Sequence, residues 1–369
     1  MRKIILVFSF VLFIIHAVPA QVPLDSLLPV RGICLSAPDK NNLEPFISFI
    51  KNDLIPMKVN TMVLRIGYNY EFKSHPELRG DHPLSKSDVK KIVKACKSGN
   101  IHIIPLINML GHQSNSTHVG QLLKAYPQFN ETPYVPTGEG ASALKWPNEW
   151  GLYCLSYCPL HPDLHKVTFD VIDEIVKVFE ADAFHAGMDE VFYLGDKKCP
   201  RCGGRDPAEL FAGEVTAIRN HLALNGKKLW IWGDRLIDGK TTGLGIWEAS
   251  YNHTSRAIDM IPKDVVICDW HYERPDPTAA IFALKGFKVI TCPWGNAESA
   301  KVQLQEMVDF RQHATRQTRN NFCGMMQTIW TGTGNFLDGY YGRKDLADRR
   351  GNQVECFKVL FQEIDKLGK

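Results

Sequence analysis

Residues 164–191 read LHKVTFDVIDEIVKVFEADAFHAGMDEV, a helical pattern followed by a short strand pattern. Between Asp163 and Glu180 the apolar residues recur at spacings of three and four, which places them on one face of a helix. Ala183–Met188 is a short run with apolar residues on both faces, as expected of a strand buried on both sides in a parallel sheet. This stretch predicts one helix–strand repeat of an α/β fold.

The same alternation continues along the chain. Three further helices are expected. One begins at Ser87, and the other two cover Glu298–Arg316 and Gln353–Leu367. Seven more apolar runs of strand character are Val30–Leu35, Thr61–Ile66, His102–Ile107, Leu229–Asp234, Val265–Trp270, Lys288–Pro293 and Gly324–Trp330. Eight strands alternating with helices predict a single (β/α)8 TIM barrel over residues 21–369, with a doubly wound open sheet as the alternative. Residues 108–162, after the third run, are rich in proline and glycine and predict a long functional loop over the active face.

The first twenty residues read as a secretory signal peptide. Arg2 and Lys3 precede the apolar run Ile4–Ile15, and small residues lead to Ala20. The run is short for a membrane span, so an uncleaved anchor is the alternative reading. We expect residues 1–20 to direct export to the periplasm or the extracellular space, with no membrane span in the mature chain.

Composition excludes several classes of protein. With 22% charged and 44% hydrophobic residues the chain is ordinary for a globular protein. Arg2 and Lys3 supply two of the 43 basic residues, so the net charge of +3 falls to about +1 without them. Such a balance gives no support to binding of a nucleic-acid backbone, which needs a clustered basic face.

Ten cysteines divide into six that stand singly in apolar segments and four that form close pairs. Cys154 and Cys158 are spaced C-x3-C, and Cys199 and Cys202 are spaced C-x2-C ahead of two glycines. The four thiolates could together hold one tetrahedral structural zinc, or each pair could close a disulfide. Zinc, disulfides and free thiols all stay open, and a four-thiolate site would leave no open position for catalysis. No other cofactor is indicated.

Two adjacent carboxylates, Asp189 and Glu190, follow the fourth predicted strand. Reactive groups of barrel enzymes lie at the carboxyl ends of the strands, and two carboxylates in different environments can hold different protonation states. The plainer alternative is a helix N-terminus whose acidic residues favour the dipole. In a barrel the tryptophans at the ends of the last four runs would converge on one pocket and offer apolar faces to sugar rings; they are Trp232, Trp270, Trp294 and Trp330.

The residues around this pair resemble glycoside hydrolase family 20, the β-N-acetylhexosaminidases. The segment from His185 to Val191, HAGMDEV, is similar to the family signature H-x-G-G-D-E. The resemblance covers residues 28–335, and the small single-domain form is most similar to the hexosaminidase D branch. Three further motifs are similar to those of the family's first, third and fifth strands: Arg31-Gly32, Asn108-Met-Leu-Gly111-His112 and Trp232-Gly-Asp234.

The resemblance implies an exo-acting hydrolase that removes terminal N-acetylglucosamine or N-acetylgalactosamine from oligosaccharides or glycoconjugates, without a cofactor. It implies that Glu190 is the general acid and then the base. Asp189 would orient the substrate's 2-acetamido group, whose carbonyl attacks the anomeric carbon to give an oxazolinium ion. Substrate contacts would come from Arg31, His112, His185, Trp232, Asp234, Trp270, Trp294 and Trp330: the tryptophans as walls, Arg31 on hydroxyls, and the histidines as hydrogen-bond support for the carboxylates. Tyr193 and Tyr272 are the candidates for a tyrosine donor to the acetamido group.

Several positions depart from the family pattern. Met188 replaces the second glycine of the signature, and Asn108 stands where an aspartate is usual. Arg65-Ile-Gly67-Tyr68 replaces the H-x-x-D motif after the second strand, and Trp330-Thr-Gly332 lacks the carboxylate of W-x-E. These changes leave the sugar epimer open. The alternative functions are a barrel that binds amino sugars without cleaving them and a metal-dependent hydrolase using His185, Asp189 and a distant histidine.

Overall fold

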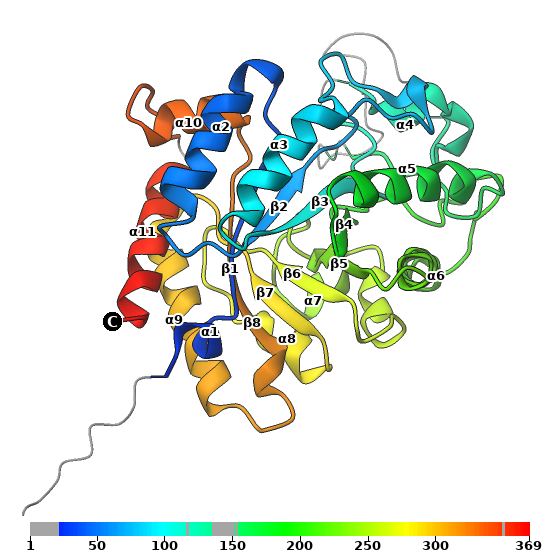
Figure 1. The fold of residues 1–369 in the computed structure, drawn as a ribbon. Helices are drawn as coiled ribbons and strands as arrows, with labels where there is room; N and C mark the ends of the chain where they lie inside the picture. The colour runs from blue at the N-terminus through cyan, green and yellow to red at the C-terminus, as the bar shows by residue number, and fades with distance from the viewer. Residues whose placement is uncertain (1–21, 116–117, 135–151, 153, 349–350) are drawn as a thin grey trace, which may run out of the picture.

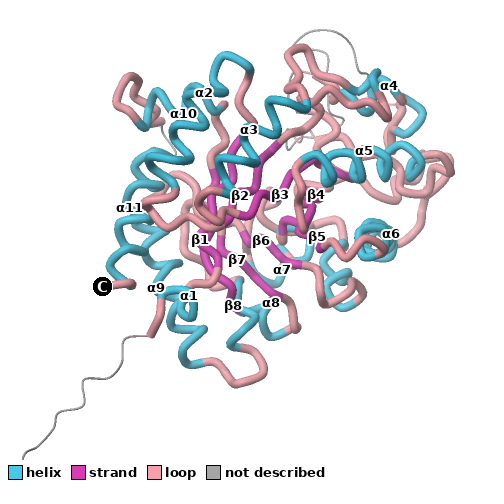
Figure 2. The backbone as a smooth tube through the Cα atoms, viewed as in Figure 1, coloured by secondary structure: helices cyan, strands magenta, loops and turns pink. Residues whose placement is uncertain are grey.

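The computed structural model describes residues 22–115, 118–134, 152, 154–348 and 351–369. Its centre is a closed barrel of eight parallel strands that follow one another in chain order. Figure 2 shows the strands gathered at the centre with the helices around them, and Figure 1 labels the elements. The predicted (β/α)8 barrel is confirmed, and each strand begins and ends within two residues of its predicted run. The strands are β1 (Val30–Ser36), β2 (Thr61–Arg65), β3 (His102–Met109), β4 (Ala183–Gly187), β5 (Lys228–Trp232), β6 (Val266–Asp269), β7 (Lys288–Thr291) and β8 (Phe322–Thr328).

Pairing between β1 and β8 closes the barrel and rules out the open sheet. Ile33 lies opposite Gln327 in this parallel pairing. Gly324 in β8 has a φ of 143°, and a Cβ atom there would lie 2.0 Å from the Val30 carbonyl oxygen. A larger side chain would push the two strands apart, so glycine is required at this position of the closing seam.

Side chains alternate between the two faces of each strand. In β5, Trp230 and Trp232 point into the barrel, whereas Leu229 and Ile231 belong to the outer core beneath the helices. The strands are therefore buried on both faces, which is why they appear in the sequence as continuous apolar runs.

The four helices expected from the sequence are α3, α5, α9 and α11. The complete set is α1 (Leu24–Leu27), α2 (Leu43–Phe49), α3 (Lys86–Lys97), α4 (Gln121–Ala125), α5 (Leu164–Val178), α6 (Pro207–Ala223), α7 (Gly239–Thr242), α8 (Ala279–Leu284), α9 (Ala297–His313), α10 (Thr333–Tyr340) and α11 (Gln353–Leu367). Helix α3 begins earlier than predicted because Ser85, not Ser87, caps it through a reciprocal capping box with Asp88. Helices α9 and α11 lie side by side near the C-terminus (Figure 1).

The long loop after β3 folds back toward the carboxyl ends of the strands. Gln113 N donates to Leu155 O at 3.0 Å, and Tyr157 N donates to Leu110 O at 3.0 Å, so the two ends of the loop run beside each other. Residues 135–151 and 153 lie outside the described part of the loop.

The predicted signal peptide, residues 1–20, also lies outside the described residues, and it stays a prediction. In the part of the chain that the structure describes, no helix combines the length and apolar character needed to cross a membrane.

Candidate active site

A cavity of about 320 Å³ opens at the carboxyl ends of the strands. Its size is near the lower end of the range for small-molecule sites, about 300–1,000 Å³, and suits a single sugar residue. It is lined by His112, Asp189, Glu190, Trp270, Tyr272, Trp294 and Trp330. Five of these seven residues follow strands as the sequence predicted, while His112 comes from the long loop and Tyr272 was one of two tyrosine candidates.

The turn after β4 brings the two carboxylates to the same side. Gly187, Met188 and Glu190 all have left-handed backbones, with φ of 66°, 66° and 50°. A Cβ atom on Gly187 would lie 2.3 Å from Asn108 Oδ1, so this position needs glycine. Asp234 Oδ2 accepts a hydrogen bond from Glu190 N at 2.9 Å and fixes the end of the turn.

Met188 occupies a left-handed position that costs a non-glycine residue about 1–3 kcal/mol. Its side chain is fully buried, so both Met188→Ala and Met188→Gly lose packing. We expect Met188→Gly to be more stable than Met188→Ala by about 1 kcal/mol in denaturant unfolding, since glycine adopts this backbone without strain. The control is Ala95→Gly, inside α3, where the backbone is helical. There the glycine variant should be less stable than the protein with alanine, the reverse of the order expected at position 188. A Met188→Ala variant that is the more stable of the pair would contradict the strain.

His112 joins the two carboxylates. Its Nε2 lies 3.0 Å from Asp189 Oδ2 and 2.9 Å from Glu190 Oε2. Burial acts to lower the pKa of His112, but the charge and hydrogen bond of Asp189 raise it well above its usual range. Burial acts to raise the pKa of Asp189, but His112 outweighs it and holds the pKa below its ordinary value. The pair is therefore an imidazolium beside an ionised Asp189.

One carboxylate oxygen of Asp189 has no protein partner among the described residues. Its Oδ1 is buried and has no hydrogen-bond partner among the described residues, although the side chain lines the cavity. A buried carboxylate oxygen without a donor is costly, and an amide N–H in the cavity would satisfy it.

Asp234 holds the site together from below the cavity surface. It accepts hydrogen bonds from Arg235 Nε at 2.6 Å and Trp270 Nε1 at 3.4 Å, besides the one from Glu190 N. Burial raises the pKa of Asp234 to about 6 in spite of the adjacent Arg235. Asp234 does not line the cavity, so the predicted contact between Asp234 and the substrate is not found. Asp234 instead positions Glu190 and Trp270.

Aromatic rings form the remaining wall. Trp270 and Tyr272 lie 4.9 Å apart between ring centroids, and Tyr272 and Trp294 lie 5.6 Å apart. Trp330 Nε1 donates to Tyr272 Oη at 2.8 Å, which fixes the hydroxyl within the cavity. Such apolar faces beside fixed polar groups suit the C–H faces of a sugar ring and a methyl group.

The sequence profile of the family described as glycosyl hydrolase family 20, catalytic domain, matches residues 58–335. The chain belongs to glycosyl hydrolase family 20. A lacto-N-biosidase of Bifidobacterium bifidum is 24% identical over 225 residues, which are 58% of this chain and 18% of that protein. A β-hexosaminidase of Porphyromonas gingivalis is 27% identical over 220 residues, 55% of this chain and 26% of that protein. The chain therefore spans less than a third of the curated relatives it matches.

Solved structures of the family share the barrel. The chitobiase of Flavobacterium johnsoniae aligns with a TM-score of 0.61 at 18% identity, over 92% of this chain and 52% of that one. A β-N-acetylhexosaminidase from Bacteroides fragilis aligns with a TM-score of 0.58 at 18% identity, over 91% and 66%. These likenesses show the fold, and the hexosaminidase D branch stays a prediction.

Arg31 corrects one expectation drawn from the family motifs. It is the second residue of β1 and lines a different cavity, at the amino end of the barrel. Its Nε donates to Lys58 O at 2.9 Å, its Nη1 donates to Leu28 O at 2.8 Å, and it pairs with Asp25. The prediction that Arg31 binds sugar hydroxyls is wrong, because the cavity lined by Asp189 and Glu190 lies at the opposite end of the barrel.

Arg65 is the arginine that the sequence analysis missed. It is the last residue of β2, where its Nη2 donates to Ser36 Oγ at 2.7 Å and Ile329 O at 2.9 Å. Its guanidinium carbon lies 4.5 Å from the centroid of the Trp330 ring, so Arg65 braces this wall of the cavity. A charged residue at the end of a buried strand needs a partner, and this was the feature of the sequence by which Arg65 could have been recognised as part of the site.

Two other predicted site residues lie beneath the cavity. His185 is fully buried, and its Nδ1 accepts a hydrogen bond from Gly187 N at 3.0 Å. The predicted hydrogen bond from His185 to the carboxylates is therefore wrong, and His185 supports the turn that carries them. Trp232 is 1% exposed and packs on His185 and Trp330, so it forms the floor under the pocket rather than its wall. Tyr193 packs in a separate cluster with Leu152.

Cys154 lies in the active site and not with the other paired cysteines. Its Sγ is 3.2 Å from Glu190 Oε2 and 3.5 Å from His112 Nδ1. Burial raises the pKa of the Cys154 thiol to about 12 even beside His112, so it is a neutral donor to Glu190. The prediction of one group of four cysteines is wrong for Cys154, which contacts His112 and Glu190 instead.

Proposed function

We propose that this family 20 protein is an exo-acting β-N-acetylhexosaminidase that works by substrate-assisted retention. The observation that carries the proposal is the side chain of Asp189, which lines the cavity, lies 3.0 Å from His112 through Oδ2, and has no hydrogen-bond partner for Oδ1 among the described residues. That oxygen suits the N–H of a 2-acetamido group, and the negative charge suits the positive charge that develops on the group during attack. Of the two relatives named above, one is a β-hexosaminidase and the other a lacto-N-biosidase.

In the proposed first step, the acetamido carbonyl oxygen bonds to the anomeric carbon as the glycosidic carbon–oxygen bond breaks. Glu190 gives its proton to the departing oxygen, which leaves as an alcohol, and the sugar becomes an oxazolinium ion. In the second step Glu190, now a carboxylate, takes a proton from water. The water oxygen bonds to the anomeric carbon and reopens the ring, so the acid form of Glu190 is restored.

A panel of aryl β-glycosides with and without the 2-acetamido group tests this proposal. We expect kcat/KM for the N-acetylglucosaminide or N-acetylgalactosaminide to exceed that for the matching glucoside or galactoside by more than about 10³-fold, since a positioned intramolecular nucleophile has a high effective molarity. Equal cleavage of the plain glucoside would refute substrate assistance. Failure of well-folded protein to cleave any member would favour the sugar-binding barrel.

An oligosaccharide arm tests the exo-acting claim. An aryl chitobioside should release its terminal N-acetylglucosamine first if the cavity accepts one sugar. An aryl lacto-N-bioside, whose terminal galactose has no 2-acetamido group, should not be cleaved. Release of an intact disaccharide as the first product would contradict it and would point to the activity named for the Bifidobacterium relative.

We also propose that the protein is exported after removal of residues 1–20. The support is the basic and then apolar pattern of that segment. N-terminal sequencing of the protein from its native host should begin at Gln21, and a chain that keeps Met1 in the cytoplasm would contradict export.

A further inference from the structure

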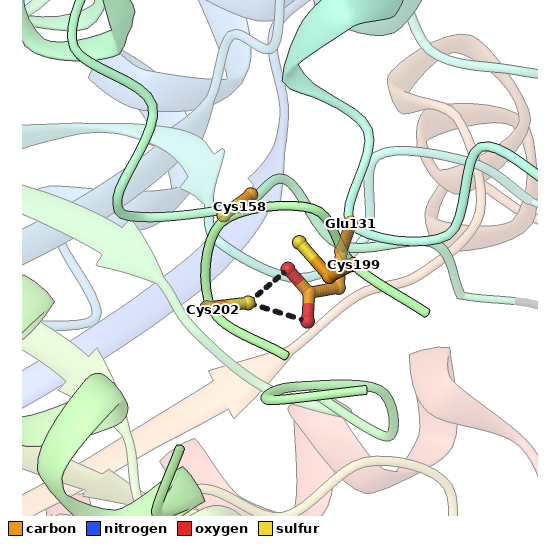
Figure 3. A group of neighbouring side chains, drawn as sticks. All are labelled: Glu131, Cys158, Cys199 and Cys202. Carbon is orange, nitrogen blue, oxygen red and sulfur yellow. Dashed lines mark hydrogen bonds between the residues drawn. The ribbon is translucent and has the colours of Figure 1, made fainter. Parts of the chain in front are cut away.

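Three of the paired cysteines meet a buried glutamate away from the active site. Glu131, Cys158, Cys199 and Cys202 each offer one ligand atom, and these atoms all lie within 4.8 Å of one another. Figure 3 shows the four side chains together, with the Cys202 sulfur beside the Glu131 carboxylate. Cys202 Sγ donates to both carboxylate oxygens of Glu131, at 2.9 and 2.8 Å. Glu131 takes the place that the sequence analysis gave to Cys154.

The group is enclosed and lacks a positive charge. Glu131, Cys158 and Cys202 are fully buried, and Cys199 is 4% exposed. Besides Cys202, Glu131 Oε1 accepts a hydrogen bond from Asp196 N at 3.1 Å. Within the described ranges no lysine, arginine or histidine forms an ion pair with Glu131. A buried carboxylate normally needs a cationic partner or a metal.

The turn that carries Cys199 and Cys202 is tightly constrained. Gly203 N donates to Cys199 O at 3.2 Å, and Arg205 N donates to Cys202 O at 3.0 Å. A Cβ atom on Gly203 would lie 2.6 Å from Cys199 O, and Gly204 has a φ of 75°, so the turn after Cys202 needs both glycines. A turn constrained in this way keeps Cys199 and Cys202 close to each other.

We propose that Glu131, Cys158, Cys199 and Cys202 bind one structural zinc ion. Three sulfurs and one oxygen in a closed, buried group match the donors and coordination number of structural zinc sites. A tetrahedron with zinc–sulfur bonds of about 2.3 Å has sulfur–sulfur edges of about 3.8 Å. The ligand atoms, all within 4.8 Å of one another, would reach this geometry by small shifts, in which the short contact between Cys202 and Glu131 lengthens. The thiolate-rich set disfavours calcium and magnesium, which prefer oxygen ligands.

The ion would tie together the two segments that flank the active site. Glu131 and Cys158 both lie in the loop after β3. They are brought side by side by the antiparallel bridge between the preceding residues, Asn130 and Tyr157. Cys199 and Cys202 lie in the segment after Glu190, ahead of α6. The ligands Glu131 and Cys158 share the long loop with His112 and Cys154, which both contact Glu190. The zinc would therefore fix the positions of these partners of the general acid without contacting the substrate.

Metal analysis of the full-length protein tests the proposal directly. Protein purified without chelator should contain one zinc per chain by elemental mass spectrometry, and a cobalt-reconstituted sample should show thiolate-to-cobalt charge-transfer absorption. Zinc removal by chelator should lower the thermal midpoint, and zinc should restore it. Zinc content is measured whether or not the protein cleaves sugars, so this test is separate from that of the proposed function.

Matched variants assign the ligands. Glu131→Gln and Cys202→Ser should lose most of the zinc, whereas Glu131→Cys should keep it and strengthen the charge-transfer band through a fourth thiolate. Glu214→Gln changes another fully enclosed carboxylate, paired with His165, and should keep the zinc. Cys96→Ser changes a buried thiol in α3 and should also keep it.

Three results would overturn the proposal. They are wild-type protein without stoichiometric metal, a disulfide within the three cysteines in non-reducing mass spectra, and stoichiometric binding of a metal other than zinc. If Cys202→Ser fails to fold, the zinc content of the wild type and of Glu131→Cys still decides the question.

Discussion

Glu190→Gln should lower kcat/KM for an aryl N-acetylhexosaminide by about 10²–10⁴-fold or more, the range that a general acid contributes. The substitution keeps the size of the side chain and its backbone hydrogen bond to Asp234, so affinity for N-acetylglucosamine as an inhibitor should change little. The cause of the loss is the missing proton for the departing oxygen. Steady-state kinetics and inhibitor binding on the same preparation separate the two effects.

The leaving group provides the internal control for Glu190. A dinitrophenolate leaves without a proton, so the deficit in kcat/KM should shrink for dinitrophenyl substrates and grow for alkyl glycosides. A uniform deficit across leaving groups would contradict the acid role. Glu174→Gln is the control and should leave kcat/KM unchanged. The carboxylate of Glu174 does not line the cavity and accepts hydrogen bonds from the backbone amides of Lys73 and Ser74.

Asp189→Asn should lower kcat/KM by about 10²–10³-fold, the loss expected when one preorganised electrostatic group is removed. Asparagine removes the negative charge beside the developing oxazolinium and leaves His112 with one carboxylate in place of two. The loss should fall mainly on kcat, because the charge acts most strongly in the transition state.

Inhibitors distinguish this role of Asp189 from general damage. A cationic analogue of the oxazolinium ring should lose more affinity for Asp189→Asn than neutral N-acetylglucosamine does. Equal losses would contradict charge stabilisation. Circular dichroism and the thermal midpoint of the variant show whether its fold is retained.

The sequence predicted the barrel because its strands are buried on both faces, so they stand out as short apolar runs. The site was harder, since strand direction decides which end a residue occupies. Arg31 is the second residue of β1 and therefore lies at the amino end of the barrel, whereas Arg65 ends β2 and lies beside Trp330. A motif match alone does not say at which end of a strand a residue lies. The boundaries of the strands do, and the sequence predicted them to within two residues.

The cysteines show a second limit. Close spacing in sequence suggested that Cys154 and Cys158 act together, but the loop turns between them and sends one to each site. Glu131 approaches Cys158 through the bridge between Asn130 and Tyr157, a long-range contact with no spacing signal. A glutamate ligand therefore had no pattern by which it could be recognised.

The position of His112 has a consequence for how charge is balanced during turnover. A single N–H, on Nε2, faces two carboxylates at 3.0 and 2.9 Å, and it can align well with one of them at a time. While Glu190 holds its proton, Asp189 is the stronger acceptor; once Glu190 has released it, the two anions compete for the same hydrogen. His112 can thus redistribute its positive charge by a small reorientation of one bond, and the protein backbone need not move between the two halves of the reaction.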